Sequence, residues 1–202
     1  MRAPVMIESS SSWNDGQNHY TYSMDLGDID GDEDLDMLIG NYGSASKLYL
    51  FDTSTQSYSL FWSTPSNYFS TAMLWFDYDY DGDPDLILGN YSGQNIGWRN
   101  DLESVSGSSG IQGDGNSWID THSDNTKDLA AGDINGDGRE DLVSINNGKN
   151  RVYLAGTWGG SYRLETSSTW SSSDSKYSNC AELADFNGDG DLDMFVANYG
   201  DV

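Results

Sequence analysis

The sequence predicts an all-β fold, built as β-propeller blades of four antiparallel strands with about four repeats along the chain. One observation behind this prediction is an acidic motif that recurs at intervals of 49, 56 and 52 residues. A second is that a short apolar run of strand length follows each copy. The third is composition, because 23 Gly and 13 Tyr accompany only 3 Pro in 202 residues, which favours short strands and tight turns over helices.

Each acidic motif is nine residues long, and two other residues keep a constant distance from it. The copies begin at Asp28, Asp77, Asp133 and Asp185. A tryptophan lies 15 residues before each start, at Trp13, Trp62, Trp118 and Trp170. An asparagine lies 13 residues after each start, at Asn41, Asn90, Asn146 and Asn198. Three markers at fixed offsets across spacers of different length define a repeat, so the insertions fall in surface loops.

Four strands are expected in each repeat. An aromatic-rich first strand, such as residues 20–26, leads into the acidic loop, and an apolar run leaves it as a second strand buried on both faces. These second strands lie at 37–39, 86–88, 142–143 and 194–196. We expect third strands at 47–51, 94–99 and 151–154, and fourth strands at 58–62 and 162–165. This succession of short strands is typical of a propeller blade.

The repeats predict a single domain over residues 1–202, and their phase leaves one blade open. Their approximate bounds are 13–61, 62–117, 118–169 and a partial repeat at 170–202. Residues 7–13 are similar to residues 164–170, so we expect residues 1–12 to act as a fourth strand that completes the open blade. The phase is compatible with a closed ring of four blades, a part of a larger ring, or a blade completed by another subunit.

Charge and composition narrow the classes of partner. The formal net charge is −24, from 33 acidic and 9 basic residues, which would repel nucleic acid and anionic membrane surfaces and favours cations. No run approaches the roughly 18 apolar residues of a membrane span, and the N-terminus has no signal-peptide run, so membrane insertion is not expected. The single cysteine, Cys180, excludes an internal disulfide and is expected to be a small core residue.

The acidic motif has the oxygen spacing of a calcium loop. Side-chain oxygens at positions 1, 3 and 5, a backbone carbonyl at position 7 and a carboxylate at position 9 can surround a hard cation of that size. The candidate ligands are Asp28, Asp30, Asp32, Asp34 and Asp36; Asp77, Asp79, Asp81, Asp83 and Asp85; Asp133, Asn135, Asp137, Arg139 and Asp141; and Asp185, Asn187, Asp189, Asp191 and Asp193. In each set the fourth residue would act through its carbonyl.

Clustered carboxylates repel one another strongly unless a cation lies between them, so three or four Ca²⁺ ions are expected. Magnesium demands octahedral geometry and zinc would require His or Cys, while solvated acidic turns are the alternative without metal. The first loop is expected to bind most weakly, because Glu33 stands where the other three loops have glycine. An EF-hand is excluded because its bidentate Glu at position 12 is replaced by Ile39, Leu88, Ser144 and Val196.

The first loop, Asp-Ile-Asp-Gly-Asp-Glu-Asp-Leu-Asp-Met, and the fourth, Asp-Phe-Asn-Gly-Asp-Gly-Asp-Leu-Asp-Met, are followed by Gly-Asn-Tyr and Ala-Asn-Tyr. These segments resemble the FG-GAP/VCBS repeats of integrin-type β-propellers, and the resemblance covers nearly the whole chain from Trp13. It implies a calcium site between the first and second strands of each blade, and an extracellular, often adhesive or glycan-associated role. Rings of this family commonly have seven blades, more than this chain holds.

Residues outside the acidic loops form no catalytic set, so the chain is not expected to be an enzyme. His19 and His122 are expected to be ordinary strand or loop residues. The glycosylation sequon that begins at Asn90 coincides with the repeat's asparagine and is interpreted as incidental. Four aromatic residues could stack on sugars or pack between blades, with packing favoured: Tyr42, Tyr91, Tyr199 and Trp98.

The sequence therefore predicts an extracellular or cell-surface module, stabilised by calcium, that acts in structure or adhesion. Strand complementation between copies would assemble it head to tail into a surface fibre, and another extracellular protein is a further candidate partner. The alternatives are a carbohydrate-binding propeller, whose partner would be a glycan, and a non-catalytic part of a polysaccharide-degrading enzyme.

Overall fold

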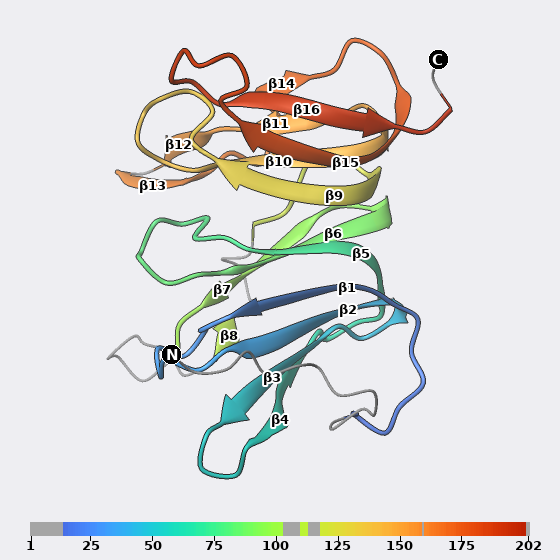
Figure 1. Ribbon diagram of the computed structural model, residues 1–202, viewed down its shortest axis with the longest axis vertical. Helices are drawn as coiled ribbons and strands as arrows, with labels where there is room; N and C mark the ends of the chain where they lie inside the picture. The colour runs from blue at the N-terminus through green and yellow to red at the C-terminus, as the bar shows by residue number, and fades with distance from the viewer. Residues whose placement is uncertain (1–13, 103–109, 113–117, 159, 201–202) are drawn as a thin grey trace.

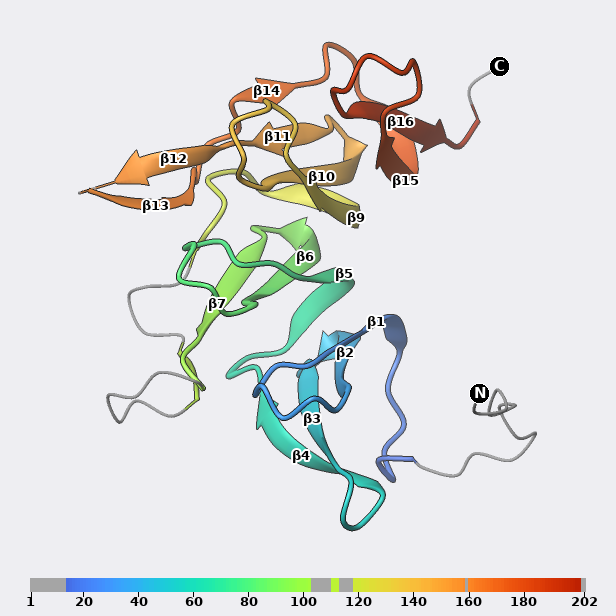
Figure 2. The same cartoon turned by 60° about the vertical axis from the view of Figure 1, so that its left-hand side comes forward.

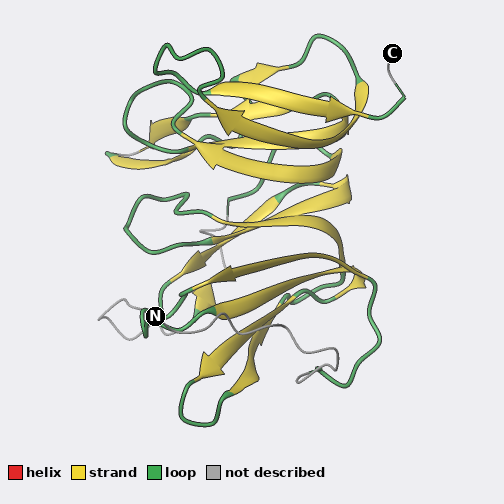
Figure 3. Ribbon diagram, viewed as in Figure 1, coloured by secondary structure: helices red, strands yellow, loops and turns green. Residues whose placement is uncertain are grey.

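The structure is a computed structural model that describes residues 14–102, 110–112, 118–158 and 160–200 of the chain. Every regular element in these ranges is a β-strand (Figure 3). The described residues contain no helix that is long and apolar enough to cross a membrane. The predicted all-β fold is confirmed. The predicted strand at residues 1–12 and the marker Trp13 lie outside the described residues.

The first repeat forms a blade with all four expected strands. They are β1 (Thr21–Gly27), β2 (Asp36–Ser44), β3 (Lys47–Asp52) and β4 (Ser57–Ser63), and they pair antiparallel in chain order. The acidic loop lies between β1 and β2, at one end of the sheet. The sequence-based order of strands and loop is therefore confirmed for this blade.

The second blade shares this arrangement, with β5 (Tyr68–Trp75), β6 (Leu86–Gly93), β7 (Ile96–Asn100) and the short β8 (Ile111–Gln112). No fourth strand was predicted here. β8 pairs with the end of β7, and an isolated bridge joins Ile96 to Ile119 further along. The outer edge of this blade is therefore built from two separate pieces of chain.

The third blade corrects one sequence-based expectation. Its first three strands are β9 (Asp124–Gly132), β10 (Asp141–Gly148) and β11 (Arg151–Tyr153), but the predicted fourth strand at 162–165 does not pair with β11. Instead, β13 (Ser161–Leu164) pairs with β12 (Ala155–Trp158) in a separate two-stranded sheet. The strand that pairs with the outer edge of β11 is β14 (Trp170–Ser171), which follows the hairpin after residues 165–169.

The fourth repeat contributes β15 (Lys176–Ala184) and β16 (Asp193–Asn198). Each blade joins the next through its second strand, in the pairs β2–β5, β6–β9 and β10–β15. The blades therefore stack in a row along the long axis (Figures 1 and 2). Among the described residues, no strand pairing connects β15 or β16 back to β1, so these strands form an open row.

Contact between blades decides which side chains are buried. Leu38, Ile87 and Val143 occupy the same repeat position in the second strands and are fully buried, whereas their counterpart Phe195 is 68% exposed. The difference arises because β16 has no blade on its outer side in the described structure. The same arrangement leaves Cys180 exposed, so the expectation of a core cysteine was wrong.

The repeat's asparagine is a buried structural residue. Asn41, Asn90 and Asn146 each donate a side-chain hydrogen bond to a carbonyl in the turn before the third strand, at 2.7–2.8 Å. Their side-chain oxygens accept hydrogen bonds from hydroxyls of the first strand. Asn90 is 3% exposed and its amide nitrogen is engaged, so the sequon offers no accessible glycosylation site in the folded chain.

Further hydrogen bonds join each blade to the next. In each case a side chain in the turn between the second and third strands contacts a hydroxyl on the first strand of the next blade. The pairs are Ser46–Ser70 at 3.1 Å, Asn95–Thr126 at 2.8 Å and Asn150–Ser178 at 3.0 Å. Buried groups that are hydrogen-bonded to one another favour one arrangement of neighbours, so these three contacts help to fix how the blades are joined, although the amide nitrogen of Asn95 has no partner in the described structure.

Two substitutions at one repeat position test the dependence of burial on the neighbouring blade. Ile87→Ala should lower the free energy of unfolding by about 2–5 kcal/mol, because it opens a cavity between two blades. Phe195→Ala should change it by less than about 0.5 kcal/mol, because the side chain is already exposed. Urea unfolding measures both. Equal losses for the two variants would show that a further blade or molecule covers Phe195 in solution.

Candidate metal centre

The first aspartate of each acidic motif holds its loop in shape. Asp28 accepts hydrogen bonds from the backbone N–H groups of Gly31, Asp32 and Glu33, at 2.9–3.1 Å. The same contacts to positions 5 and 6 are present in the second and third loops, and those to positions 4, 5 and 6 in the fourth. These bonds curl the backbone around one carboxylate. Aspartate commonly stabilises turns in this way, by accepting backbone N–H groups a few residues further along the chain.

Positions 4 and 6 of the loops adopt the left-handed backbone conformation, which favours glycine. Two residues with side chains depart from this pattern. Glu33 has a φ of 70° at position 6 of the first loop, and Tyr80 has a φ of 57° at position 4 of the second. The Tyr80 hydroxyl donates a hydrogen bond to the Glu140 carbonyl of the third blade, which helps to hold this unusual conformation.

The aspartate at position 9 lies at the start of the second strand and joins the loop to the sheet. In the first blade, one oxygen of Asp36 accepts the N–H of Ile29 at 3.1 Å, and the other accepts the N–H of Phe51 at 2.9 Å. Asp85 and Asp141 make the equivalent two contacts, and all three carboxylates are fully buried. Asp36 and Asp85 therefore connect the acidic loop to the backbone of the third strand, and Asp141 connects it to Ala155, just after β11.

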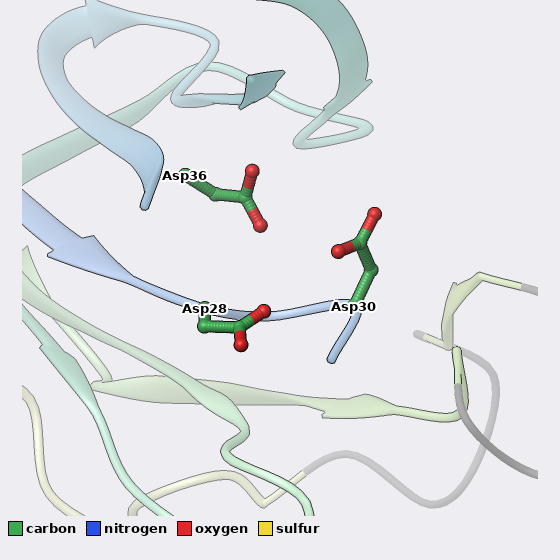
Figure 4. A group of neighbouring side chains, drawn as sticks. All are labelled: Asp28, Asp30 and Asp36. Carbon is green, nitrogen blue, oxygen red and sulfur yellow. The ribbon is translucent and has the colours of Figure 1, made fainter. Parts of the chain in front are cut away.

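The structure brings carboxylates from positions 1, 3 and 9 together in two loops. Ligand oxygens of Asp28, Asp30 and Asp36 lie within 4.8 Å of one another, and their carboxylates converge (Figure 4). Asp77, Asp79 and Asp85 form the equivalent group in the second loop. One oxygen of the position 3 residue, Oδ1, is buried without a hydrogen-bond partner in both groups. An unpaired buried carboxylate oxygen is costly, so this site fits a bound cation.

Burial disfavours the ionised form of these carboxylates. It raises the pKa of Asp79 to about 6 and that of Asp85 to about 8, and the neighbouring carboxylates add to both shifts. Burial also raises the pKa values of Asp30 and Asp36 in the first loop. A cation among these groups would supply the missing positive charge and would favour their ionised forms.

The remaining predicted ligands lie closer to solvent. The position 5 carboxylates Asp32, Asp81, Asp137 and Asp189 accept the backbone N–H of position 7 in their own loops, at 2.9–3.1 Å. The position 7 residues Asp34, Asp83, Arg139 and Asp191 donate these bonds. Among the described residues, the carboxylate groups within 4.8 Å include positions 1, 3 and 9 but not position 5.

The third and fourth loops differ from the first two in the number of carboxylates. Asn135 and Asn187 replace aspartate at position 3, which leaves an amide oxygen in that place. Arg139 forms an ion pair with Asp137 at 2.7 Å and lies over the Tyr162 ring, at 4.2 Å from its centroid. The number of carboxylates at the ligand positions is therefore greatest in the first two loops. That the first loop binds calcium most weakly, because of Glu33, stays a prediction.

The histidines and aromatic residues considered in the sequence analysis make contacts within the fold. His122 lies 2.9 Å from Asp120, which also accepts the Tyr153 hydroxyl at 2.6 Å. His19 lies 4.0 Å from Asp15, which occupies the place of Asp120 in the first repeat, whereas the second and fourth repeats have Thr64 and Ser172 there. Trp98 is buried and cannot offer a face to a sugar, and Tyr42 packs on Phe69 of the second blade as packing between blades requires.

Comparison with family models matches the FG-GAP-like repeat at residues 28–88, 77–142 and 133–196. Each match begins at the first aspartate of an acidic loop and ends in the second strand of the next blade. The chain belongs to the FG-GAP repeat family. A search of curated protein sequences finds no match to it. The FG-GAP unit therefore contains two acidic loops and the interface between the blades that carry them.

Sequence reasoning found the FG-GAP loops but missed two features around them. One is the bond from position 9 to a backbone N–H of the third strand, which the linear spacing does not show. The other is Tyr80, although its place was visible: Gly31, Gly136 and Gly188 occupy position 4 in the other loops. A substituted glycine in an aligned repeat was the available signal.

Substitutions at the two left-handed positions should act in opposite directions. Glu33→Gly should raise the free energy of unfolding by about 1 kcal/mol, because glycine adopts this conformation without strain. Tyr80→Gly should lower it by about 1 kcal/mol or more, because the hydrogen bond to Glu140 is lost together with a partly buried ring. Thermal and urea unfolding in calcium measure the changes. Stabilisation by both substitutions would contradict the structural role of Tyr80.

Proposed function

We propose that this FG-GAP protein is a calcium-stabilised structural or adhesion module that acts outside the cell or on its surface. FG-GAP repeats form β-propeller-like modules that are generally non-catalytic. The observation that carries the proposal is the convergence of three buried or partly buried carboxylates in each of two loops, with an unpaired oxygen on Asp30 and on Asp79.

Calcium fits this donor set better than other common cations. It takes six to eight oxygen ligands in flexible geometry, and each loop offers carboxylates together with a backbone carbonyl. Zinc would favour His or Cys, which the acidic loops lack. Bound Ca²⁺ would supply the positive charge that lets the crowded carboxylates remain ionised. The third and fourth loops offer the same spacing with one amide oxygen, which supports a total of three or four ions.

An extracellular setting follows from the affinity expected of such sites. Calcium sites of extracellular modules bind at roughly 10⁻⁴ to 10⁻³ M, a concentration range that the cytosol does not supply. The net charge of −24 opposes nucleic acid as a partner and is partly compensated by divalent cations. Self-association and other extracellular proteins remain the partners that the proposal favours.

A non-enzymatic role is supported by the environments of the titratable residues. His122 and His19 each lie beside an aspartate that also accepts a tyrosine hydroxyl, and the acidic clusters have the geometry of cation sites. A hydroxyl does lie beside an imidazole, at Thr121 and His122, but their contact is long at 3.4 Å and exposed to solvent. The proposed activity is therefore binding and assembly through surfaces of the blades.

Removal of calcium should destabilise the protein strongly. Each site adds about 2.7 kcal/mol at a hundredfold excess of free ion over its Kd, so the melting temperature should fall steeply with chelator. Asp79→Asn should reduce the calcium-dependent shift, because it removes a carboxylate from the second group. Asp174→Asn, at an exposed aspartate outside the loops, should leave the shift unchanged.

Scanning calorimetry with calcium, with magnesium and with chelator measures these effects. A shift with calcium that magnesium does not reproduce supports the proposal. Superimposable melting curves in calcium and in chelator would show that the loops are solvated acidic turns and would remove the basis of the proposed function.

A glycan-binding role is a second candidate, favoured by a surface cavity of about 230 Å³ in the second blade. Its lining combines Tyr68, Phe69 and Tyr91 with polar side chains such as Asn67 and Gln94. Aromatic faces beside amide groups suit the apolar face and hydroxyls of a sugar ring.

A glycan array in calcium tests this candidate. Binding should be lost in Tyr91→Ala and retained in Tyr199→Ala, which removes the equivalent tyrosine of the fourth blade, outside the cavity. An array without signal for the unmodified protein would argue against the glycan role and leave the structural module.

A further inference from the structure

The first and second acidic loops are joined by hydrogen bonds to one asparagine. Asn100 lies at the end of β7 and is fully buried. Its side-chain nitrogen donates to the Ile29 carbonyl of the first loop at 2.9 Å and to the Pro84 carbonyl of the second loop at 3.2 Å. Its backbone N–H donates to Asp85 at 2.8 Å. One residue therefore contacts the backbone of two loops and a carboxylate of the second candidate cation site.

The second and third loops are joined by a different residue. Tyr80, at position 4 of the second loop, donates its hydroxyl hydrogen to the carbonyl of Glu140, at position 8 of the third. Pro84 is at position 8 of the second loop, so both junctions use the same carbonyl. Ala155 corresponds to Asn100, because the backbone N–H of each donates to the position 9 aspartate of its blade. Alanine has no side-chain amide, and the tyrosine hydroxyl supplies a donor in its place.

Both junctions contact the loops beside the candidate ligands. Ile29 stands between Asp28 and Asp30, and Tyr80 directly follows Asp79. The carbonyl at position 8 stands between position 7, whose carbonyl is a predicted ligand, and the aspartate at position 9. A change in the backbone of one loop therefore moves hydrogen-bond partners that flank the ligands of the next loop.

The residue at position 2 of each of these two loops is also held by the next blade. Ile29 is 1% exposed and belongs to the same buried cluster as Leu86 and Trp98 of the second blade. Tyr78 is buried too, and its carbonyl accepts the backbone N–H of Leu164 in the third blade at 2.7 Å. Close-packed interiors transmit strain, so neither loop can rearrange without effect on its neighbour.

Unpaired carboxylate oxygens make the shape of the first two loops sensitive to a cation. The Asp79 side chain is 10% exposed and its Oδ1 has no hydrogen-bond partner, and Oδ1 of Asp30 is buried in the same way. A cation beside these oxygens removes the cost of burying them unpaired and favours the ordered loop. An ordered loop holds its side of the junction in place, so the next loop loses less freedom when it binds its own ion.

We propose that Asn100 and Tyr80 couple the cation sites of the first three loops, so that calcium binds to them cooperatively. Asn100 couples the first site to the second, and Tyr80 couples the second site to the third. This inference rests on the proposed function, because it requires that the loops bind calcium. Coupling between two sites is reciprocal, so loss of the second site weakens calcium binding at both the first and the third.

Hydrogen–deuterium exchange of the full chain over a range of calcium concentrations tests the coupling, because mass spectrometry of its peptides reads each loop separately. Asp79→Ala removes an oxygen donor from the second site. We expect this variant to raise, by about fivefold or more, the calcium concentration that gives half-maximal protection of the first and third loops.

Variants at the junctions separate the two couplings. In Tyr80→Phe, which removes one hydroxyl and keeps the ring, Asp79→Ala should no longer affect the third loop but should still affect the first. In Asn100→Ala the reverse is expected. Tyr58→Phe is the matched control and should preserve both couplings, because the Tyr58 hydroxyl donates to the position 8 carbonyl of the first loop, Leu35, from within the same blade.

Melting curves in calcium establish which variants are folded, and Tyr80→Phe changes a partly exposed side chain, so it decides the outcome if the buried Asn100→Ala variant does not fold. Unchanged midpoints in the first and third loops after Asp79→Ala, or a dependence of the third loop that survives in Tyr80→Phe, would overturn the coupling and leave calcium binding in place. Loops of the unmodified chain that gain no protection from calcium would overturn this inference and the proposed function together.

Discussion

The buried aspartate at the end of each acidic loop is the constraint on which the blade depends. Asp36, Asp85 and Asp141 each accept one backbone N–H from the loop with one oxygen. With the other oxygen they accept the backbone N–H two residues after the aromatic residue of the third strand. A buried carboxylate needs such partners, because an unpaired charge away from water is very costly. The same carboxylate belongs to the candidate cation site in the first two blades, so one group joins the loop, the strand and that site.

The second strand is fixed at both ends by polar groups and along its middle by apolar ones. Its beginning carries the buried aspartate, and its end carries the asparagine that joins the next turn to the first-strand hydroxyl. Between them lie the fully buried Leu38, Ile87 and Val143. Because the asparagine network continues into the next blade, each repeat stabilises its neighbour, as expected for a chain of similar units in contact.

The contacts that hold the blades together lie at repeated positions. The loops and the asparagine network occupy these positions, while other surfaces differ between blades. The cavity beside Tyr91 lies next to strands whose positions are fixed by these repeated contacts.

The sequence by itself determined the repeat and the order of strands around each loop, and it predicted twenty ligand positions, of which the structure gathers the carboxylates of positions 1, 3 and 9 in two loops. These properties follow from local spacing: alternate acidic residues and glycines define a loop wherever they occur, and short apolar runs define strands. It also indicated the unusual Glu33, since an aligned repeat shows which glycine has been replaced.

Only the tertiary structure decided burial and partnership. Phe195 and Cys180 have apolar or small side chains typical of a core, yet they are exposed, because burial depends on the blade that covers a position rather than on the residue itself. The hairpin of β12 and β13, the contact of Tyr80 with the next loop and the second bond of Asp36 are equally non-local. Each joins segments whose separation in sequence carries no periodic signal, so three-dimensional packing alone could place them.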